Sequence, residues 1–161
     1  MVLVTGGAGF IGSHLIDRLL DRGESVLCVD DFNDFYSPSI KRANVASHLN
    51  SGDYQLIEGD IRNSQVLQKL FDGARINKIV HLAARAGVRP SLELPLLYED
   101  VNVRATMQLL EMAAKHKIEQ FVFASSSSVY GGNTKTPFTE DDRISRTVSP
   151  YAATKYAGEL M

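Results

Sequence analysis

The sequence has almost no cysteine and no long apolar run, the features on which many secreted and membrane proteins depend. It contains one cysteine, Cys28, among 161 residues. A single thiol cannot form an internal disulfide, so we expect a reducing compartment and predict a cytoplasmic protein. No apolar run reaches the ~18 residues that a membrane span needs. No basic segment precedes an apolar one at the N-terminus, so a signal peptide is not expected.

Neither sign of charge is in excess. Lys and Arg number 17 and Asp and Glu number 19, which gives a net charge of −2. A chain with a net charge this close to zero lacks the excess of basic residues that binds nucleic acid or an anionic membrane, so we expect neither as a partner. The histidines show no shared metal-ligand spacing, so no metal site is predicted. Hydrophobic residues make up 44%, enough for a real core.

Short apolar runs alternate with amphipathic segments along the chain. We expect strands at residues 1–5, 25–30, 54–57, 78–84 and 120–126. Helices are expected at residues 10–22, 38–49, 64–71 and 94–116, with a loop over 131–148 and a last helix that begins at 149–150. This alternation is typical of parallel β-α-β units. It predicts an α/β fold with a doubly wound parallel sheet of about five strands in the order 3-2-1-4-5.

A glycine-rich turn joins the first predicted strand to the first helix. Gly7, Gly9 and Gly12 fit Gly-x-Gly-x-x-Gly, and Gly6, Gly9 and Gly12 fit a variant with one more intervening residue. Glycines at this place let backbone amides approach a pyrophosphate at a helix N-terminus. The turn therefore indicates a dinucleotide site, the alternative being a tight turn without a ligand.

An acidic residue follows at the spacing that dinucleotide sites use. Asp30 ends the second predicted strand, 18 residues after Gly12, where it would accept hydrogen bonds from ribose hydroxyls. Its charge would repel a 2′-phosphate, and no Lys or Arg follows before Lys41, so NAD is favoured over NADP. Asp31 and Asn33 are further candidates for contact with the ribose, although turn formation would explain them about as well. Asp60 and Ile61 are candidates for contact with the adenine, with helix capping as the alternative for Asp60.

Tyr151 and Lys155 lie four residues apart in the last predicted helix, so they share a face. A nearby ammonium lowers the pKa of a phenol and makes it a usable general base. The alternative is a solvated surface pair. The glycine turn and the serines at 125–128 favour the catalytic interpretation.

Together these motifs resemble the extended short-chain dehydrogenase/reductase family, which includes sugar-nucleotide epimerases and dehydratases. The resemblance is carried, in the family's order, by residues 6–12, 60–61, 81–84, 125–131 and 151–155. Residues 33–36 and 84–91 are similar to the UDP-glucuronate 4-epimerase branch. The resemblance implies a Rossmann-type NAD-binding domain over residues 1–161, without the C-terminal substrate-binding part of relatives about twice this length.

The resemblance also implies the site residues. The catalytic residues would be Ser126, Tyr151 and Lys155, with Ser126 orienting the sugar hydroxyl. Residues implied to contact NAD are Gly6, Gly9, Phe10, Ile11, Gly12, Leu82, Ala83, Ala84, Asn102, Tyr151 and Lys155. Those implied to contact the substrate are Ser126, Ser127, Ser128 and Arg89, although Ser127 and Ser128 could be ordinary strand-end residues and Arg89 a surface loop charge.

The implied activity is NAD-dependent epimerisation at C4 of a UDP-sugar, UDP-glucuronate or a related UDP-hexose, through a transient 4-keto intermediate. Related dehydratases carry an acid where Ser127 and Ser128 lie, and its absence favours simple epimerisation. The alternative is an NAD-binding module without turnover, and an NADP-linked reductase is a weaker third hypothesis. The face that the missing part would cover should be apolar, which predicts a homo-oligomer.

Overall fold

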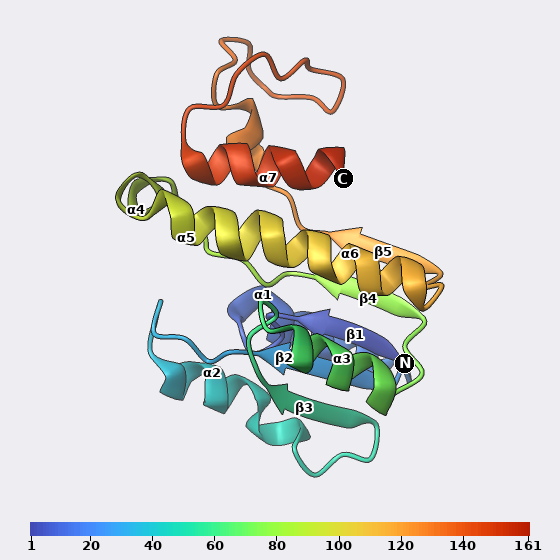
Figure 1. The fold of residues 1–161 in the computed structure, drawn as a ribbon. Coiled ribbons are helices and arrows are strands. Elements are labelled where there is room, and N and C mark those ends of the chain that lie inside the picture. The colour runs from blue at the N-terminus through green and yellow to red at the C-terminus, as the bar shows by residue number, and fades with distance from the viewer. The chain divides into compact units, whose positions relative to one another are not determined.

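The computed structural model describes residues 1–161 and contains one five-stranded sheet (Figure 1). Its strands are β1 (Val2–Thr5), β2 (Val26–Asp30), β3 (Tyr54–Glu58), β4 (Lys78–His81) and β5 (Gln120–Phe123). They lie in the order β3-β2-β1-β4-β5, and β1 pairs in parallel with β2 and β4, as β2 does with β3. The predicted α/β fold and strand order are confirmed.

Seven α-helices accompany the strands, six of them between strands and α7 after β5. They are α1 (Phe10–Asp21), α2 (Pro38–Val45), α3 (Ser64–Gly73), α4 (Val88–Glu93), α5 (Pro95–Glu99), α6 (Ala105–Lys115) and α7 (Pro150–Leu160). Short 3-10 turns cover Ala46–His48 and Ser127–Tyr130, and a π-helical segment covers Asp100–Arg104. None of the helices combines the length and the apolar character that crossing a bilayer requires.

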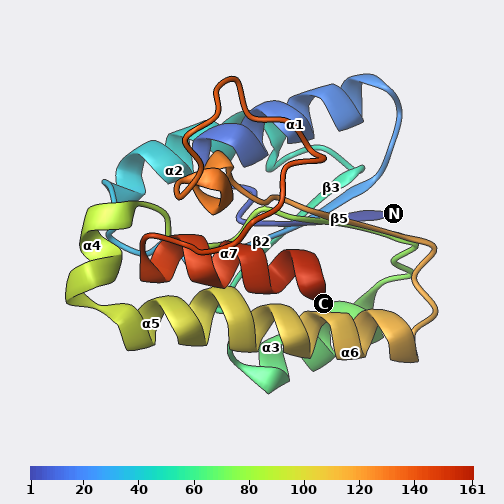
Figure 2. The ribbon, with the colours of Figure 1, turned by 90° about the horizontal axis from the view of Figure 1, so that it is seen from above.

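The chain divides into two compact units. The first consists of residues 1–83 and 108–122, and the second of residues 84–107 and 123–161. Within the first unit, α1 and α2 lie on one face of the sheet and α3 lies on the other (Figure 2). Within the second unit, α7 lies beside α5 and packs against α4 and the 3-10 turn at Ser127–Tyr130.

The main difference from the predicted elements concerns the helix expected at residues 94–116. It is divided into α5, the π-helical segment and α6, and α4 precedes it as an unpredicted helix. Pro95 restricts the backbone of the residue before it, so α4 ends and α5 begins there. Pro90 is compatible with α4 because it lies in the first turn, where a residue without a backbone N–H breaks no helical hydrogen bond.

The remaining differences lie at the ends of elements. β4 and β5 each end three residues earlier than predicted, and α2 ends at Val45 before a 3-10 turn. The chain leaves β5 early because Ser126 caps the following 3-10 turn, its Oγ accepting a hydrogen bond from the amide of Ser128. The other predicted strand and helix bounds agree within two residues.

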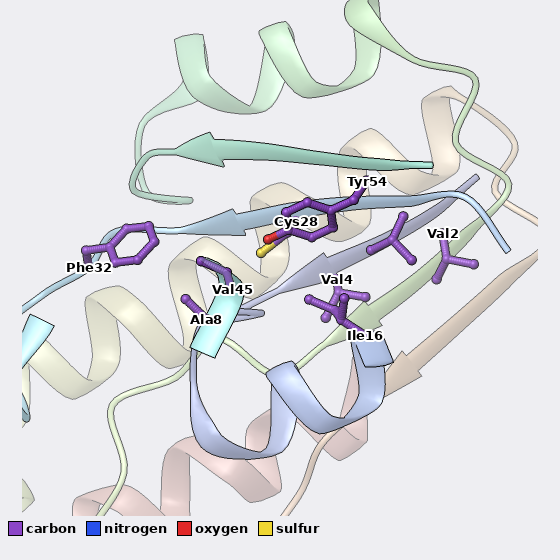
Figure 3. Packing of buried hydrophobic residues seen from close by; sticks show 9 residues of the cluster. Val2, Val4, Ala8, Ile16, Cys28, Phe32, Val45 and Tyr54 are labelled. Atoms are coloured by element: carbon purple, nitrogen blue, oxygen red, sulfur yellow. The ribbon is translucent and has the colours of Figure 1, made fainter. Parts of the chain in front are cut away.

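The core of the first unit explains the apolar runs of β1 and β2. Every residue of both strands is buried, as expected for central strands of a parallel sheet. One face packs against α1 and α2 through a cluster of Val2, Val4, Ala8, Ile16, Val26, Cys28, Phe32, Val45 and Tyr54 (Figure 3). Burial raises the pKa of the Cys28 thiol to about 12, so this cysteine stays protonated and serves as a small core residue.

The glycine turn leaves no room for side chains. A Cβ built on Gly12 would lie 2.4 Å from the carbonyl oxygen of Gly6. A Cβ on Gly6, whose φ is 68°, would lie 2.8 Å from the Cα of Ala83. Backbone atoms form both contacts, so the turn keeps its shape only with glycine at these positions.

We predict that Gly12→Ala lowers the free energy of unfolding by about 1–3 kcal/mol, because packed backbone atoms must move to admit the methyl group. Gly73→Ala is the matched control, since a Cβ there meets nothing within 4 Å. That substitution should be neutral or stabilise the fold by up to about 1 kcal/mol. Urea denaturation measures both variants, and equal effects would contradict the close packing of the turn.

Candidate active site

The glycine turn presents the N-terminus of α1 without a side-chain cap. Gly9 is the N-cap residue and has no side chain that could cap the helix, and the Tyr36 hydroxyl lies near the amide of Phe10. Phe10 and Ile11 are 71% and 68% exposed. The hydroxyl of Tyr36 lies 3.8 Å from the position of a Gly9 Cβ, where it is buried and makes no hydrogen bond of ordinary geometry. A helix N-terminus without a side-chain cap and a buried tyrosine hydroxyl beside it together fit the pyrophosphate of a dinucleotide.

Asp30 lies at the carboxyl end of β2, and its side chain is buried. Its Oδ2 accepts a hydrogen bond from the amide of Ala8 at 3.1 Å, and its Oδ1 accepts one from the amide of Phe32 at 2.9 Å. The Nζ of Lys41 lies 3.5 Å from the same Oδ1. Lys41 is the first basic residue after Asp30 in the sequence, and α2 returns its side chain to the end of β2.

The secondary adenosine candidates make local contacts. Asp31 Oδ1 accepts from the amide of Asn33 at 3.0 Å, which is the turn expected as the alternative. Asp60 Oδ1 accepts from the amide of Arg62 at 2.9 Å and pairs with its guanidinium, while Ile61 beside it is buried. The cap of α3 is Asn63 and not Asp60, because the Asn63 side chain accepts from the amide of Gln65.

Leu82 and Ala83 are attached to β1 next to the glycine turn. The amide of Leu82 donates to the carbonyl of Thr5 at 3.1 Å, and the amide of Ala83 donates to Thr5 Oγ1 at 3.2 Å. Thr5 Oγ1 also lies 2.6 Å from Nδ1 of the buried His81. His81 is therefore a core residue whose ring is hydrogen-bonded within the first unit. Ala84 begins the second unit.

Within the second unit, α7 carries Tyr151 and Lys155 one helical turn apart. Ser149 caps the helix, its Oγ accepting from the amide of Ala152 at 3.1 Å, and Pro150 occupies the first turn. The Tyr151 ring contacts Tyr98 edge-on with 6.2 Å between ring centroids. The predicted start of the last helix is confirmed.

The ammonium of Lys155 is buried with few partners. It donates to the carbonyl of Ala124 at 2.8 Å and lies 4.9 Å from the centre of the Phe123 ring. Burial lowers its pKa to about 8. The helix comes this close because Gly158 has no side chain, since a Cβ there would lie 2.3 Å from the Phe123 ring. An ammonium held in a poorly hydrated place interacts strongly with any negative charge that forms near it.

The serines and Arg89 lie elsewhere in the second unit. Ser126 precedes the 3-10 turn that packs against α7, and Ser127 and Ser128 belong to that turn. Ser125 donates to the Glu159 carboxylate of α7. Arg89 is exposed and lies in α4, so the alternative of a loop charge is corrected to a helical surface charge.

Asn102 connects α7 to the segment at Arg85. It is buried in the π-helical segment, and its Nδ2 donates to both the Arg85 carbonyl and Thr154 Oγ1 at 3.0 Å. Its Oδ1 accepts from the amide of Arg85 at 2.7 Å. Thr154 in turn donates to the carbonyl of Tyr151 at 2.8 Å. Sequence reasoning missed Thr154, whose place next to Lys155 was the one signal that could have found it.

We predict that Asn102→Ala lowers the free energy of unfolding by about 2–3 kcal/mol, since it removes three hydrogen bonds that a buried side chain makes to Arg85 and Thr154. Asn44→Ala is the matched control. Asn44 makes one side-chain hydrogen bond, to the carbonyl of Ala8 at 3.0 Å, and is only partly buried, so its loss should cost about 1 kcal/mol. Chemical denaturation compares the two, and a smaller effect at Asn102 would contradict its connecting role.

The family model for GDP-mannose 4,6 dehydratase matches residues 3–161. The chain belongs to this family. UDP-glucuronate 4-epimerase 3 of Arabidopsis thaliana is 48% identical over 159 residues, which are 98% of this chain and 37% of the relative. Protein CapI of Staphylococcus aureus is 42% identical and covers 99% of this chain and 48% of its own length.

Solved members of the family have the same fold. UDP-glucuronic acid 4-epimerase of Bacillus cereus, in complex with UDP-glucuronic acid and NAD, superposes with a TM-score of 0.88 at 37% identity over 99% of this chain and 50% of its own. UDP-glucose 4-epimerase of Thermus thermophilus, in complex with NAD, gives a TM-score of 0.86 at 36% identity over 99% and 48%. The chain thus spans half or less of the length of these family members.

Proposed function

We propose that this chain carries the NAD-binding and catalytic part of a 4-epimerase that acts on UDP-glucuronate or a related UDP-hexose. The observation that carries the proposal is the Tyr151 and Lys155 pair on the capped helix α7, with the ammonium buried, in a chain of this family. The UDP-glucuronate 4-epimerases among its relatives support the substrate class.

The first unit would hold the cofactor. The amides at the start of α1 and the hydroxyl of Tyr36 would bind the pyrophosphate, and Asp30 would accept from the adenosine ribose. Asp30 already uses its oxygens for two amides and one ammonium, which leaves room for about one ribose hydroxyl. NAD supplies a hydride acceptor when bound.

The second unit would move the proton. Tyr151, in its phenolate form, takes the proton of the sugar 4-hydroxyl when the C4 hydride leaves, and the phenol so formed returns that proton to the 4-keto oxygen when hydride comes back to the other face. The Lys155 ammonium would stabilise the phenolate form of Tyr151 before it takes the proton. Ser126 holds the sugar oxygen. Ser127 and Ser128 contribute no carboxylate, so this turn supplies no acid or base for loss of water, and epimerisation is favoured over dehydration.

The test is to give the purified chain NAD and UDP-glucuronate and to follow the sugar by proton NMR. The proposal predicts bound NAD and the appearance of UDP-galacturonate until the two epimers reach equilibrium. Bound NAD without any product would overturn the epimerase and leave an NAD-binding module. Absence of NAD binding would overturn the cofactor assignment as well.

A further inference from the structure

The ring of Tyr151 lies against the ring of Tyr98, which belongs to α5. The ring centres are 6.2 Å apart and the ring planes meet at 84°, an edge-to-face contact of the kind that aromatic pairs favour. Both residues belong to the second unit, in which α5 packs against α7 (Figure 2). The residue proposed above to move the proton therefore packs against an aromatic ring from a different helix.

The side chain of Tyr98 is anchored. Tyr98 is 1% exposed, whereas Tyr151 is only partly buried. The Tyr98 hydroxyl donates a hydrogen bond to the carbonyl of Ala86. Burial raises the pKa of Tyr98, so its hydroxyl keeps the proton that this bond needs. Tyr98 thus gives the Tyr151 ring a fixed surface to pack against.

Other contacts fix the backbone at Tyr151 rather than its ring. Ser149 caps α7, and Thr154 donates to the Tyr151 carbonyl at 2.8 Å. The direction of the ring depends on two further torsion angles, each with more than one energy minimum. Proton transfer requires the Tyr151 oxygen to lie within hydrogen-bond reach of the sugar 4-hydroxyl. The edge-to-face contact with Tyr98 favours one ring direction over the others.

We propose that Tyr98 is a positioning residue for the epimerisation, which holds the Tyr151 ring in the direction that proton transfer requires. The inference rests on the proposed function and adds to it a residue that acts through Tyr151. The ring of Tyr98 carries this role, since the ring makes the contact and the hydroxyl bonds to Ala86. A displacement of about 1 Å in a reacting group can lower a rate by about 100-fold, so loss of the Tyr98 ring should lower kcat.

The test measures kcat and KM for UDP-glucuronate with the NAD-loaded chain, together with melting temperatures. Tyr98→Leu removes the ring and should lower kcat by about 10- to 100-fold, with KM within about twofold of the wild type. Tyr98→Phe keeps the ring and should retain kcat within about twofold, although it melts earlier because the bond to Ala86 is lost. Tyr98→Met, which fills the space with a flexible apolar chain, replaces Tyr98→Leu if the latter does not fold.

Tyr54→Leu is the matched control, because Tyr54 is a buried tyrosine in the core of the first unit and is 5% exposed. It should lower the melting temperature and leave kcat unchanged. A second check repeats the substitution in the Tyr151→Phe background. Since Tyr98 acts through the oxygen of Tyr151, Tyr98→Leu should lower the residual rate there by less than about threefold.

Four results, each with an active wild type, would overturn the role of Tyr98 and leave the proposed function standing. The first is a wild-type kcat in Tyr98→Leu, and the second is an equal loss of kcat in Tyr98→Leu and Tyr98→Phe. The third is an equal loss in Tyr98→Leu and Tyr54→Leu. The fourth is a loss in the Tyr151→Phe background as large as in the wild type. A wild type without turnover would overturn the proposed function itself.

Discussion

Tyr151→Phe should lower the rate of epimerisation by about 1000-fold and leave NAD affinity unchanged, because the substitution removes one hydroxyl that acts as acid and base. The phenylalanine ring keeps the edge-on contact with Tyr98, so α7 should stay in place. The rate is followed by NMR with UDP-glucuronate, and NAD binding by calorimetry. Tyr156→Phe, on the same helix, is the matched control and should behave like the wild type.

Three outcomes would contradict this account. Activity of Tyr151→Phe close to that of the wild type would mean that another group moves the proton. Equal losses in Tyr151→Phe and Tyr156→Phe would mean that the effect comes from damage to α7. A loss of NAD binding in Tyr151→Phe alone would assign the hydroxyl to the cofactor and not to proton transfer.

Lys155→Met should abolish epimerisation and change how stability depends on pH. The pKa of Lys155 is about 8 in the folded protein and 10.5 for an ordinary lysine. Between these values the unfolded chain holds a proton that the folded chain has released, so the free energy of unfolding rises with pH across this window. Relative to Lys155→Met, the wild type should gain up to about 3 kcal/mol between pH 7 and pH 10.5.

Urea denaturation at several pH values measures this difference. Below pH 8 the wild type bears the full desolvation penalty of the ammonium, and the methionine variant does not. The variant still loses the bond to the Ala124 carbonyl, an effect that does not change with pH, so the slope is the informative quantity. Parallel stability curves for the two proteins would show that the folded protein does not disfavour the charged form of Lys155.

The sequence predicted most of the fold because the fold depends on local patterns. Apolar runs at β1 and β2, the glycine turn and the start of the last helix each depend on a few neighbouring residues, and the structure has all three where they were expected. The π-helical segment at Asp100–Arg104 had no such local signal. It accompanies hydrogen bonds from Asn102 to Arg85 and Thr154, which are 17 and 52 residues away.

In the candidate site too, features set by neighbouring residues could be predicted and features set by distant contacts could not. The place of Asp30 could be predicted because the glycine turn, one helix and one strand set its spacing from Gly12. The pairing of Tyr151 with Lys155 could be predicted because both lie on one face of the same helix. The return of Lys41 to Asp30 depends on how α2 packs, which spacing alone does not reveal. The burial of Lys155 depends likewise on the missing side chain of Gly158 and on the Phe123 ring.

The central claim is that hydride leaves C4 of a UDP-sugar and returns to the same carbon. The most direct measurement uses UDP-glucuronate with deuterium at C4, incubated with the purified chain and less NAD than sugar. The account predicts UDP-galacturonate with deuterium still at C4, formed in excess over the NAD present. No product, or product whose C4 deuterium has exchanged with water, would contradict it.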